Sequence, residues 1–93
     1  MNIKRLKIAR RKIDQIDQKI FYLIKRRTGI VNYMLSLKKF KKEIIDHKRI
    51  NEILKKIKYK SIQNGIDPEV TKRIWKSMIW GYVNFQKKNL KKK

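Results

Sequence analysis

The sequence has no cysteine, one proline and three glycines in 93 residues, and these absences exclude several kinds of protein. Without cysteine there is no disulfide framework and no thiolate metal site, which fits a reducing cytosol. No apolar run approaches the roughly 20 residues that a membrane-spanning helix needs. The basic N-terminal segment also lacks the apolar stretch of a signal peptide. We therefore expect a soluble, cytoplasmic protein with no membrane partner.

Acidic residues are scarce as well, because 7 Asp and Glu stand against 28 Lys and Arg, for a formal net charge of +21. Such an excess is common in proteins that bind nucleic acid or acidic surfaces. Here 21 of the basic residues are lysines dispersed along the chain, and Lys91, Lys92 and Lys93 form a short basic tail. We expect weak, nonspecific adhesion to polyanions and no specific nucleic-acid partner. A noncatalytic, basic helical protein that binds nucleic acid stays open as an alternative of another class.

Apolar residues recur with helical spacing in three segments, and no segment has the alternation of a β-strand. The first segment runs from about residue 2 to 40. The second begins at Asp46, a suitable N-cap, and stops at Asn64-Gly65, and the third begins at Asp67-Pro68. The expected inner residues are Ile50, Ile53, Leu54 and Ile57 of the second helix, and Val70, Ile74, Trp75, Met78, Ile79, Tyr82, Phe85 and Gln86 of the third. This pattern predicts a single all-α domain, residues 1–93, with one long and two shorter helices.

A seven-residue repeat in the first segment gives two stripes that are apolar at nine of ten positions. The stripes are Leu6, Ile13, Ile20, Arg27 and Met34, and Ala9, Ile16, Leu23, Ile30 and Leu37. Arg27 is the exception, and no acidic residue occupies positions 23, 24, 30 or 31, one helical turn away. A guanidinium stays charged and is costly to bury without an anion. We interpret Arg27 as facing a cavity that receives an anionic ligand, and an ion pair with an acid of another helix is the alternative.

A first helix of this length cannot bury its whole stripe against two shorter helices of the same chain. Two copies that pair through this helix, in an intertwined six-helix body, would bury it. We therefore expect a homodimer.

Four polar residues beyond Arg27 are further candidates for a binding site. Lys38 lies eleven residues after Arg27, about 16 Å and 20° along an ideal helix, so the two can bracket a small ligand. Asp46 and Arg49 share a face at i, i+3, and Gln86 is a neutral donor among apolar residues. Each has a plainer interpretation, since Lys38 can be solvated, Asp46 can act only as a cap, and Gln86 can simply tie two helices together. No nucleophile, metal cluster or acid–base pair has catalytic spacing, so we expect no metal and no cofactor.

The order of these residues resembles the all-helical chorismate mutase family over about residues 10 to 86. The residues that carry the resemblance are Arg10, Ile13, Asp14, Ile16, Asp17, Ile20, Leu23, Ile24, Arg27, Lys38, Asp46, Arg49, Gly65, Ile66, Asp67, Pro68 and Gln86. The resemblance implies a helical homodimer whose two active sites each take one arginine, here Arg10, from the neighbouring subunit. The helix geometry agrees, because Arg10 lies about 25 Å upstream of Arg27 and about 100° round the helix. Both can reach one small ligand only from different chains.

The resemblance further implies a cofactor-free rearrangement of chorismate, a small dianion, to prephenate. By the family pattern, arginines hold the two carboxylates and two donors approach the ether oxygen. The implied catalytic residues are Arg10, Arg27, Lys38 and Gln86, and the substrate-binding set adds Asp46, Arg49, Ile50 and Tyr82. Fork-shaped guanidinium groups suit carboxylates, and an ammonium or amide donor suits a single oxygen.

Two positions depart from the usual mutase pattern. Ile50 stands where a glutamate is common, and Tyr82 stands where a serine is common. Both departures are similar to isochorismate pyruvate lyase, a sister enzyme that releases pyruvate and salicylate on the same fold. Asp46, however, is typical of mutases. The resemblance therefore favours a mutase, with the lyase as the alternative.

Overall fold

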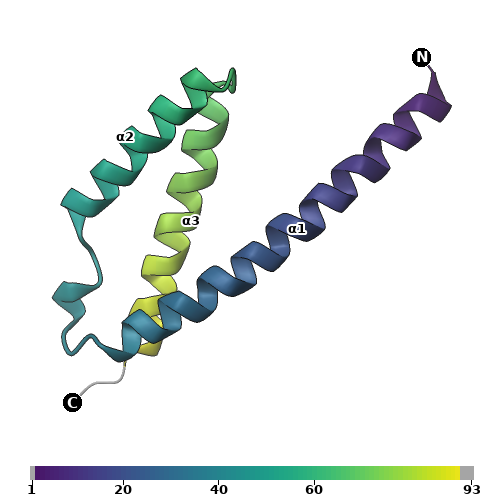
Figure 1. The fold of residues 1–93 in the computed structure, drawn as a ribbon. Helices are drawn as coiled ribbons and strands as arrows, with labels where there is room; N and C mark the ends of the chain where they lie inside the picture. The colour runs from purple at the N-terminus through teal and green to yellow at the C-terminus, as the bar shows by residue number, and fades with distance from the viewer. Residues whose placement is uncertain (1, 91–93) are drawn as a thin grey trace. The chain divides into compact units, whose positions relative to one another are not determined.

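The computed structural model describes residues 2–90, which form helices joined by short connections (Figure 1). The elements are α1 (Ile3–Ser36), the 3₁₀ helix η1 (Lys41–Glu43), α2 (His47–Gln63) and α3 (Pro68–Asn89). No strand is present among these residues, so the predicted all-α fold with one long and two shorter helices is confirmed. None of the described helices is long and apolar enough to cross a membrane. The basic tail predicted at residues 91–93 lies outside the described residues.

The chain divides into two compact units, Met1–Tyr33 and Met34–Lys93. Most of α1 makes up the first unit. The second contains the end of α1, η1, α2 and α3. A single domain over residues 1–93 stays a prediction.

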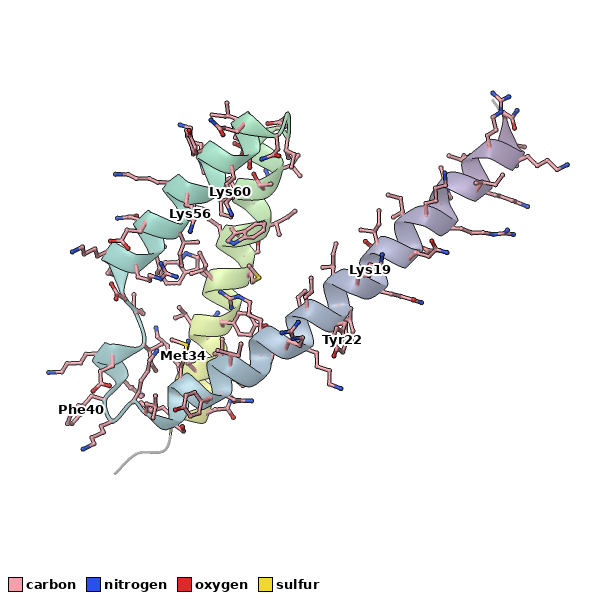
Figure 2. The ribbon with its side chains drawn as sticks, in the orientation of Figure 1. Lys19, Tyr22, Met34, Phe40, Lys56 and Lys60 are labelled. Atoms are coloured by element: carbon pink, nitrogen blue, oxygen red, sulfur yellow. The ribbon has the colours of Figure 1, made fainter. Side chains whose placement is uncertain are left out.

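The first unit is a helix that leaves most of its apolar side chains in solvent. Asn2 begins it as the N-cap, because its Oδ1 accepts a hydrogen bond from the Arg5 N–H at 3.0 Å. Side chains such as Lys19 and Tyr22 project freely from the helix (Figure 2). Five residues of the predicted stripes, Ile13, Ile16, Ile20, Leu23 and Ile30, are 48% to 59% exposed. The helix is therefore formed as expected, and within this unit its apolar stripe is exposed.

The first helix ends at Ser36, which corrects the predicted end near Phe40. Its last turn tightens, since the N–H groups of Leu37 and Lys38 donate to carbonyls three residues back, each at 3.1 Å. The chain then turns extended at Phe40, whose φ and ψ are −127° and 145°. The four lysines at 38, 39, 41 and 42 offer no apolar face that would hold a further turn.

In the second unit, α2 and α3 pack side by side and run in opposite directions (Figure 1). Both predicted N-caps are confirmed: Asp46 Oδ1 accepts from the Arg49 N–H at 3.0 Å, and Asp67 Oδ1 accepts from the Glu69 N–H at 2.9 Å. The predicted end of α2 is confirmed too. Gly65 adopts φ 69°, and the N–H groups of residues 65 and 66 bond back to the carbonyls of residues 62 and 61. This is a Schellman ending, which favours glycine at that position.

The two helices are tied by buried polar and apolar groups. Ser61 is buried, its hydroxyl donates to the Ile57 carbonyl, and it lies 2.6 Å from the Thr71 hydroxyl of α3. The inner residues predicted for α2 are all at least half-buried, and Ile79 and Val83 of α3 are buried.

Two residues expected on the inner side of α3 lie elsewhere. Val70 and Ile74 are each 53% exposed. Helix geometry explains this, because both point about 140° or more away from Ile79, which is buried. The apolar positions of α3 therefore cover more of its circumference than α2 can bury.

Replacement of Gly65 by alanine tests the positive-φ ending of α2. We expect Gly65→Ala to lower the free energy of unfolding by about 1 kcal/mol, because a Cβ disfavours the left-handed conformation. Gly81→Ala is the matched control, since this glycine is within α3 and no atom lies within 4 Å of the Cβ it would gain. The control should be more stable by about 0.5–1 kcal/mol. Urea denaturation followed by circular dichroism measures both, and equal effects would contradict the assignment.

Candidate active site

The second unit brings together two of the predicted site residues, Lys38 and Gln86. Lys38 follows the last turn of α1, and Gln86 lies near the end of α3. The Lys38 Nζ donates to the Gln86 Oε1 at 2.8 Å, across 48 residues of sequence. Gln86 is buried, with 8% of its surface exposed, and Lys38 is half-buried. An ammonium and an amide therefore meet at the edge of the core.

This contact fixes the direction of the Gln86 amide. An ammonium can only donate, so the atom it touches must be the amide oxygen. The Gln86 Nε2 then points to the Tyr82 carbonyl at 3.3 Å, one turn back on α3. The Tyr82 carbonyl accepts a hydrogen bond from one of the two amide N–H groups, so the other can still donate. The ammonium likewise has two N–H groups beyond the one that donates to Gln86. The pair thus offers several donors and no carboxylate, a combination that suits an anion or an ether oxygen.

The aromatic neighbour in this part of α3 is Tyr82, which is half-buried. Its ring meets Phe85 edge to face, with the ring centroids 6.5 Å apart and the planes at 88°. Tyr82 therefore contributes a backbone acceptor to Gln86, and its ring contacts Phe85.

Three further predicted residues cluster at the start of α2. Asp46 and Arg49 are exposed, and Ile50 is half-buried. The Asp46 carboxylate bonds the backbone N–H of Arg49, and within residues 2–90 no ion pair joins it to the Arg49 guanidinium. Asp46 thus caps α2, and its part in binding substrate stays a prediction. The guanidinium is turned to solvent, where an anion can reach it.

The remaining two candidates, Arg10 and Arg27, lie on α1 in the first unit. Arg10 is exposed, and Arg27 is half-buried. Because the helix is continuous from Ile3 to Ser36, these arginines keep the separation of about 25 Å and 100° predicted from the sequence. One copy of α1 therefore cannot place both guanidinium groups on the same small ligand.

Acidic residues and histidine do not cluster in the described part of the chain. Within residues 2–90 no group of three or more His, Cys, Asp or Glu is placed to hold a metal ion.

The family model for chorismate mutase type II matches residues 9–87, which is most of the chain. No curated protein matches the chain. No solved structure matches it either.

A double-mutant cycle measures the contact between Lys38 and Gln86. We expect Lys38→Met and Gln86→Met each to destabilise the fold, because each leaves a polar partner unsatisfied, and the double variant to cost less than their sum. The coupling should be about 1–2 kcal/mol in urea denaturation. The adjacent Lys39, whose side chain is exposed, provides the control in Lys39→Met. Additive single effects would mean that the contact contributes nothing.

Proposed function

The chain belongs to the chorismate mutase type II family, and we propose that it converts chorismate to prephenate. The reaction is a unimolecular, pericyclic rearrangement in which one C–O bond breaks as one C–C bond forms. No group must attack the substrate covalently or remove a proton. The protein can accelerate it by holding the compact conformer and by placing fixed donors where negative charge grows on the ether oxygen.

The observation that supports this most directly is the hydrogen bond from Lys38 to Gln86. By the family pattern these are the two groups that approach the ether oxygen, and they are in contact with each other. Donors that are already oriented need little reorganisation when charge develops in the transition state. The lack of a carboxylate between them also suits a negatively charged substrate.

The carboxylates of the substrate are assigned to the three arginines of the family pattern. Arg49 stands at the first turn of α2 with an exposed guanidinium, and Arg27 is half-buried on α1. Arg10 completes the set from a second copy of the chain. The separation of Arg10 and Arg27 along one helix supports this sharing, because no single copy can bring both to one ligand.

A second copy also accounts for the uncovered apolar surface of each unit. The stripe of α1 exposes five residues that are 48% to 59% accessible. In the second unit Ile66, Val70 and Ile74 are 46% to 53% exposed. Contiguous apolar surface of this kind is costly in water and marks an interface. We therefore propose a homodimer with two shared active sites.

Isochorismate pyruvate lyase is the alternative function, and Ile50 favours it. This residue is half-buried in the first turns of α2, where the mutase pattern has a glutamate that holds the substrate hydroxyl. Isochorismate carries its hydroxyl at another ring position and eliminates pyruvate to give salicylate. Asp46 favours the mutase, and it is why we place that activity first.

Product identification with the two substrates offered separately tests the proposal. We expect prephenate from chorismate, and Lys38→Ala should lower kcat by about a hundredfold or more, the cost of one lost donor at a reacting oxygen. The neighbouring exposed Lys39→Ala should retain full activity. Salicylate and pyruvate from isochorismate would establish the lyase instead. No product from either substrate would refute both.

Complementation between two inactive variants tests the shared site. Arg10→Ala and Arg27→Ala homodimers should each lose activity by orders of magnitude, since each lacks one carboxylate ligand at both sites. In a heterodimer of the two, one site loses both arginines and the other regains both. Each mixed dimer should therefore recover up to about half of the activity of a dimer in which both sites are intact. Absence of recovery in heterodimers verified by mass would argue against donation of Arg10.

Restoring a carboxylate at position 50 tests the choice of substrate. Ile50→Glu should raise kcat/KM for chorismate relative to isochorismate by about tenfold, because a buried hydroxyl partner discriminates strongly between analogues. Ile50→Gln is the uncharged control. An unchanged ratio would mean that residue 50 does not select the substrate.

A further inference from the structure

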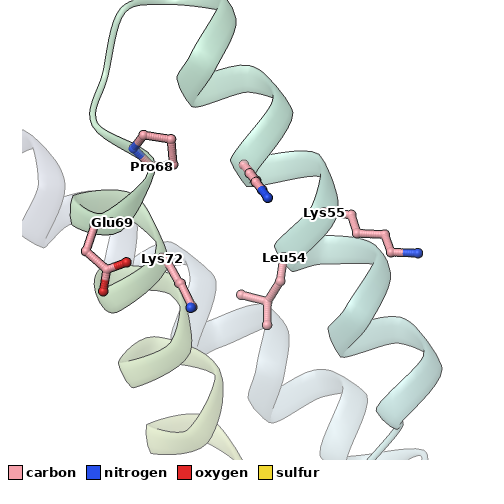
Figure 3. Close-up of a pocket in the computed structure, with 6 residues that line it drawn as sticks. Leu54, Lys55, Pro68, Glu69 and Lys72 are labelled. Carbon is pink, nitrogen blue, oxygen red and sulfur yellow. The ribbon is translucent and has the colours of Figure 1, made fainter.

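The helix pair α2 and α3 also contains a pocket that none of the predicted active-site residues lines. This pocket of about 300 Å³ opens between α2 and α3 (Figure 3). Leu54 and Pro68 give it an apolar floor, and charged side chains surround them: Lys55, Lys58, Glu69 and Lys72. In Figure 3 Leu54 and Lys72 point toward the gap between the helices, whereas Lys55 projects outward from α2.

The charge around this pocket is predominantly positive. Three ammonium groups from two helices line it, against the single carboxylate of Glu69. That carboxylate already accepts from Arg73 Nε at 3.3 Å, one turn along α3. The negative charge of Glu69 is therefore largely offset, and the lysines have no acidic partner within the pocket. Their summed field attracts anions.

The basic edge of α3 continues past the pocket and reaches an aromatic residue. Lys76 follows Lys72 by one turn, and Trp80 follows Lys76 by one turn, about 12 Å in all. The Trp80 side chain is 39% exposed, although an indole of this size normally gains much from burial. The other tryptophan of the helix, Trp75, is half-buried. An exposed indole thus stands at the end of a row of ammonium groups.

We propose that this face, made of Lys55, Lys58, Lys72, Lys76 and Trp80 and called here the groove face, binds single-stranded nucleic acid without sequence preference. The ammonium groups contact phosphates, and Trp80 stacks on a base. A positive groove combined with a stacking aromatic is the recurring solution for single strands. Contacts from ammonium groups to phosphates position the strand and carry no sequence information.

The apolar content of the groove face favours nucleic acid over an anionic membrane. Binding to a bilayer scales with the apolar area that a helix inserts. Of the other exposed apolar residues of α3, Val70 and Ile74 each lie about 160° round the helix from Lys72. The groove face of α3 therefore presents one indole, which is enough to stack on a base and little to anchor in lipid.

The first experiment compares two variants of equal charge by fluorescence anisotropy with a labelled oligothymidine of about 12 nucleotides. The groove variant carries Lys55→Gln, Lys58→Gln, Lys72→Gln and Lys76→Gln. The control variant carries Lys12→Gln, Lys25→Gln, Lys41→Gln and Lys88→Gln, at four exposed positions elsewhere. The groove variant should bind at least about tenfold more weakly than the control at the same salt, since it loses the direct phosphate contacts. Equal losses would overturn the proposal and leave only diffuse charge.

The second experiment follows Trp80 itself in a Trp75→Phe background, where it is the only indole. Oligothymidine should quench its fluorescence, and heparin, a polyanion without bases, should bind without quenching. Trp80→Leu should weaken oligothymidine binding by about tenfold, with heparin binding unchanged. Circular dichroism checks that each variant stays helical. Quenching by heparin alone, or tighter binding to anionic phospholipid vesicles than to oligothymidine, would contradict a nucleic-acid site.

Discussion

The hydrogen bond between Lys38 and Gln86 is the contact on which the candidate site depends. It connects the segment that leaves α1 to the last turns of α3, and it does so with an ammonium that needs an acceptor and a buried amide that needs a donor. Removing either group would leave the other without its partner at the edge of an apolar core, and an unsatisfied polar group there costs about 1–3 kcal/mol of stability. The same contact sets the orientation of the amide, so one interaction serves both the fold and the proposed chemistry.

Local features of the fold could be predicted from the sequence because they depend on neighbouring residues. Asp46, Asp67 and Gly65 mark helix ends through bonds that reach at most five residues along the chain. The end of α1 was predicted too late, at Phe40, because the apolar repeat continues through Leu37 although the lysines after it give a helix nothing to pack. Val70 and Ile74 were assigned to the inner side because they are apolar and have helical spacing. That spacing does not show which neighbouring helix, if any, covers a given side of α3.

The candidate site could be predicted only as a set of residues. That Lys38 and Gln86 touch depends on a chain reversal over 48 positions, for which no spacing rule exists. The cap made by Asp46 could be predicted from the sequence, whereas its part in binding substrate stays a prediction. The groove face was not predicted at all, because Lys55, Lys58 and Lys72 differ from the many solvated lysines only in lining one pocket with Leu54 and Pro68.

The uncovered stripe of α1 has a consequence for how the molecule becomes ordered. An isolated helix in water draws little stability from its backbone, and α1 has no acidic residue in its first turn to offset the positive end of its dipole. In the proposed homodimer, most of what keeps it helical comes from the apolar surface that the second copy covers. Folding of α1 and association are then one mass-action equilibrium. If the proposed homodimer forms, dilution alone would unwind the N-terminal part of the chain, which carries Arg10, the arginine proposed to be shared.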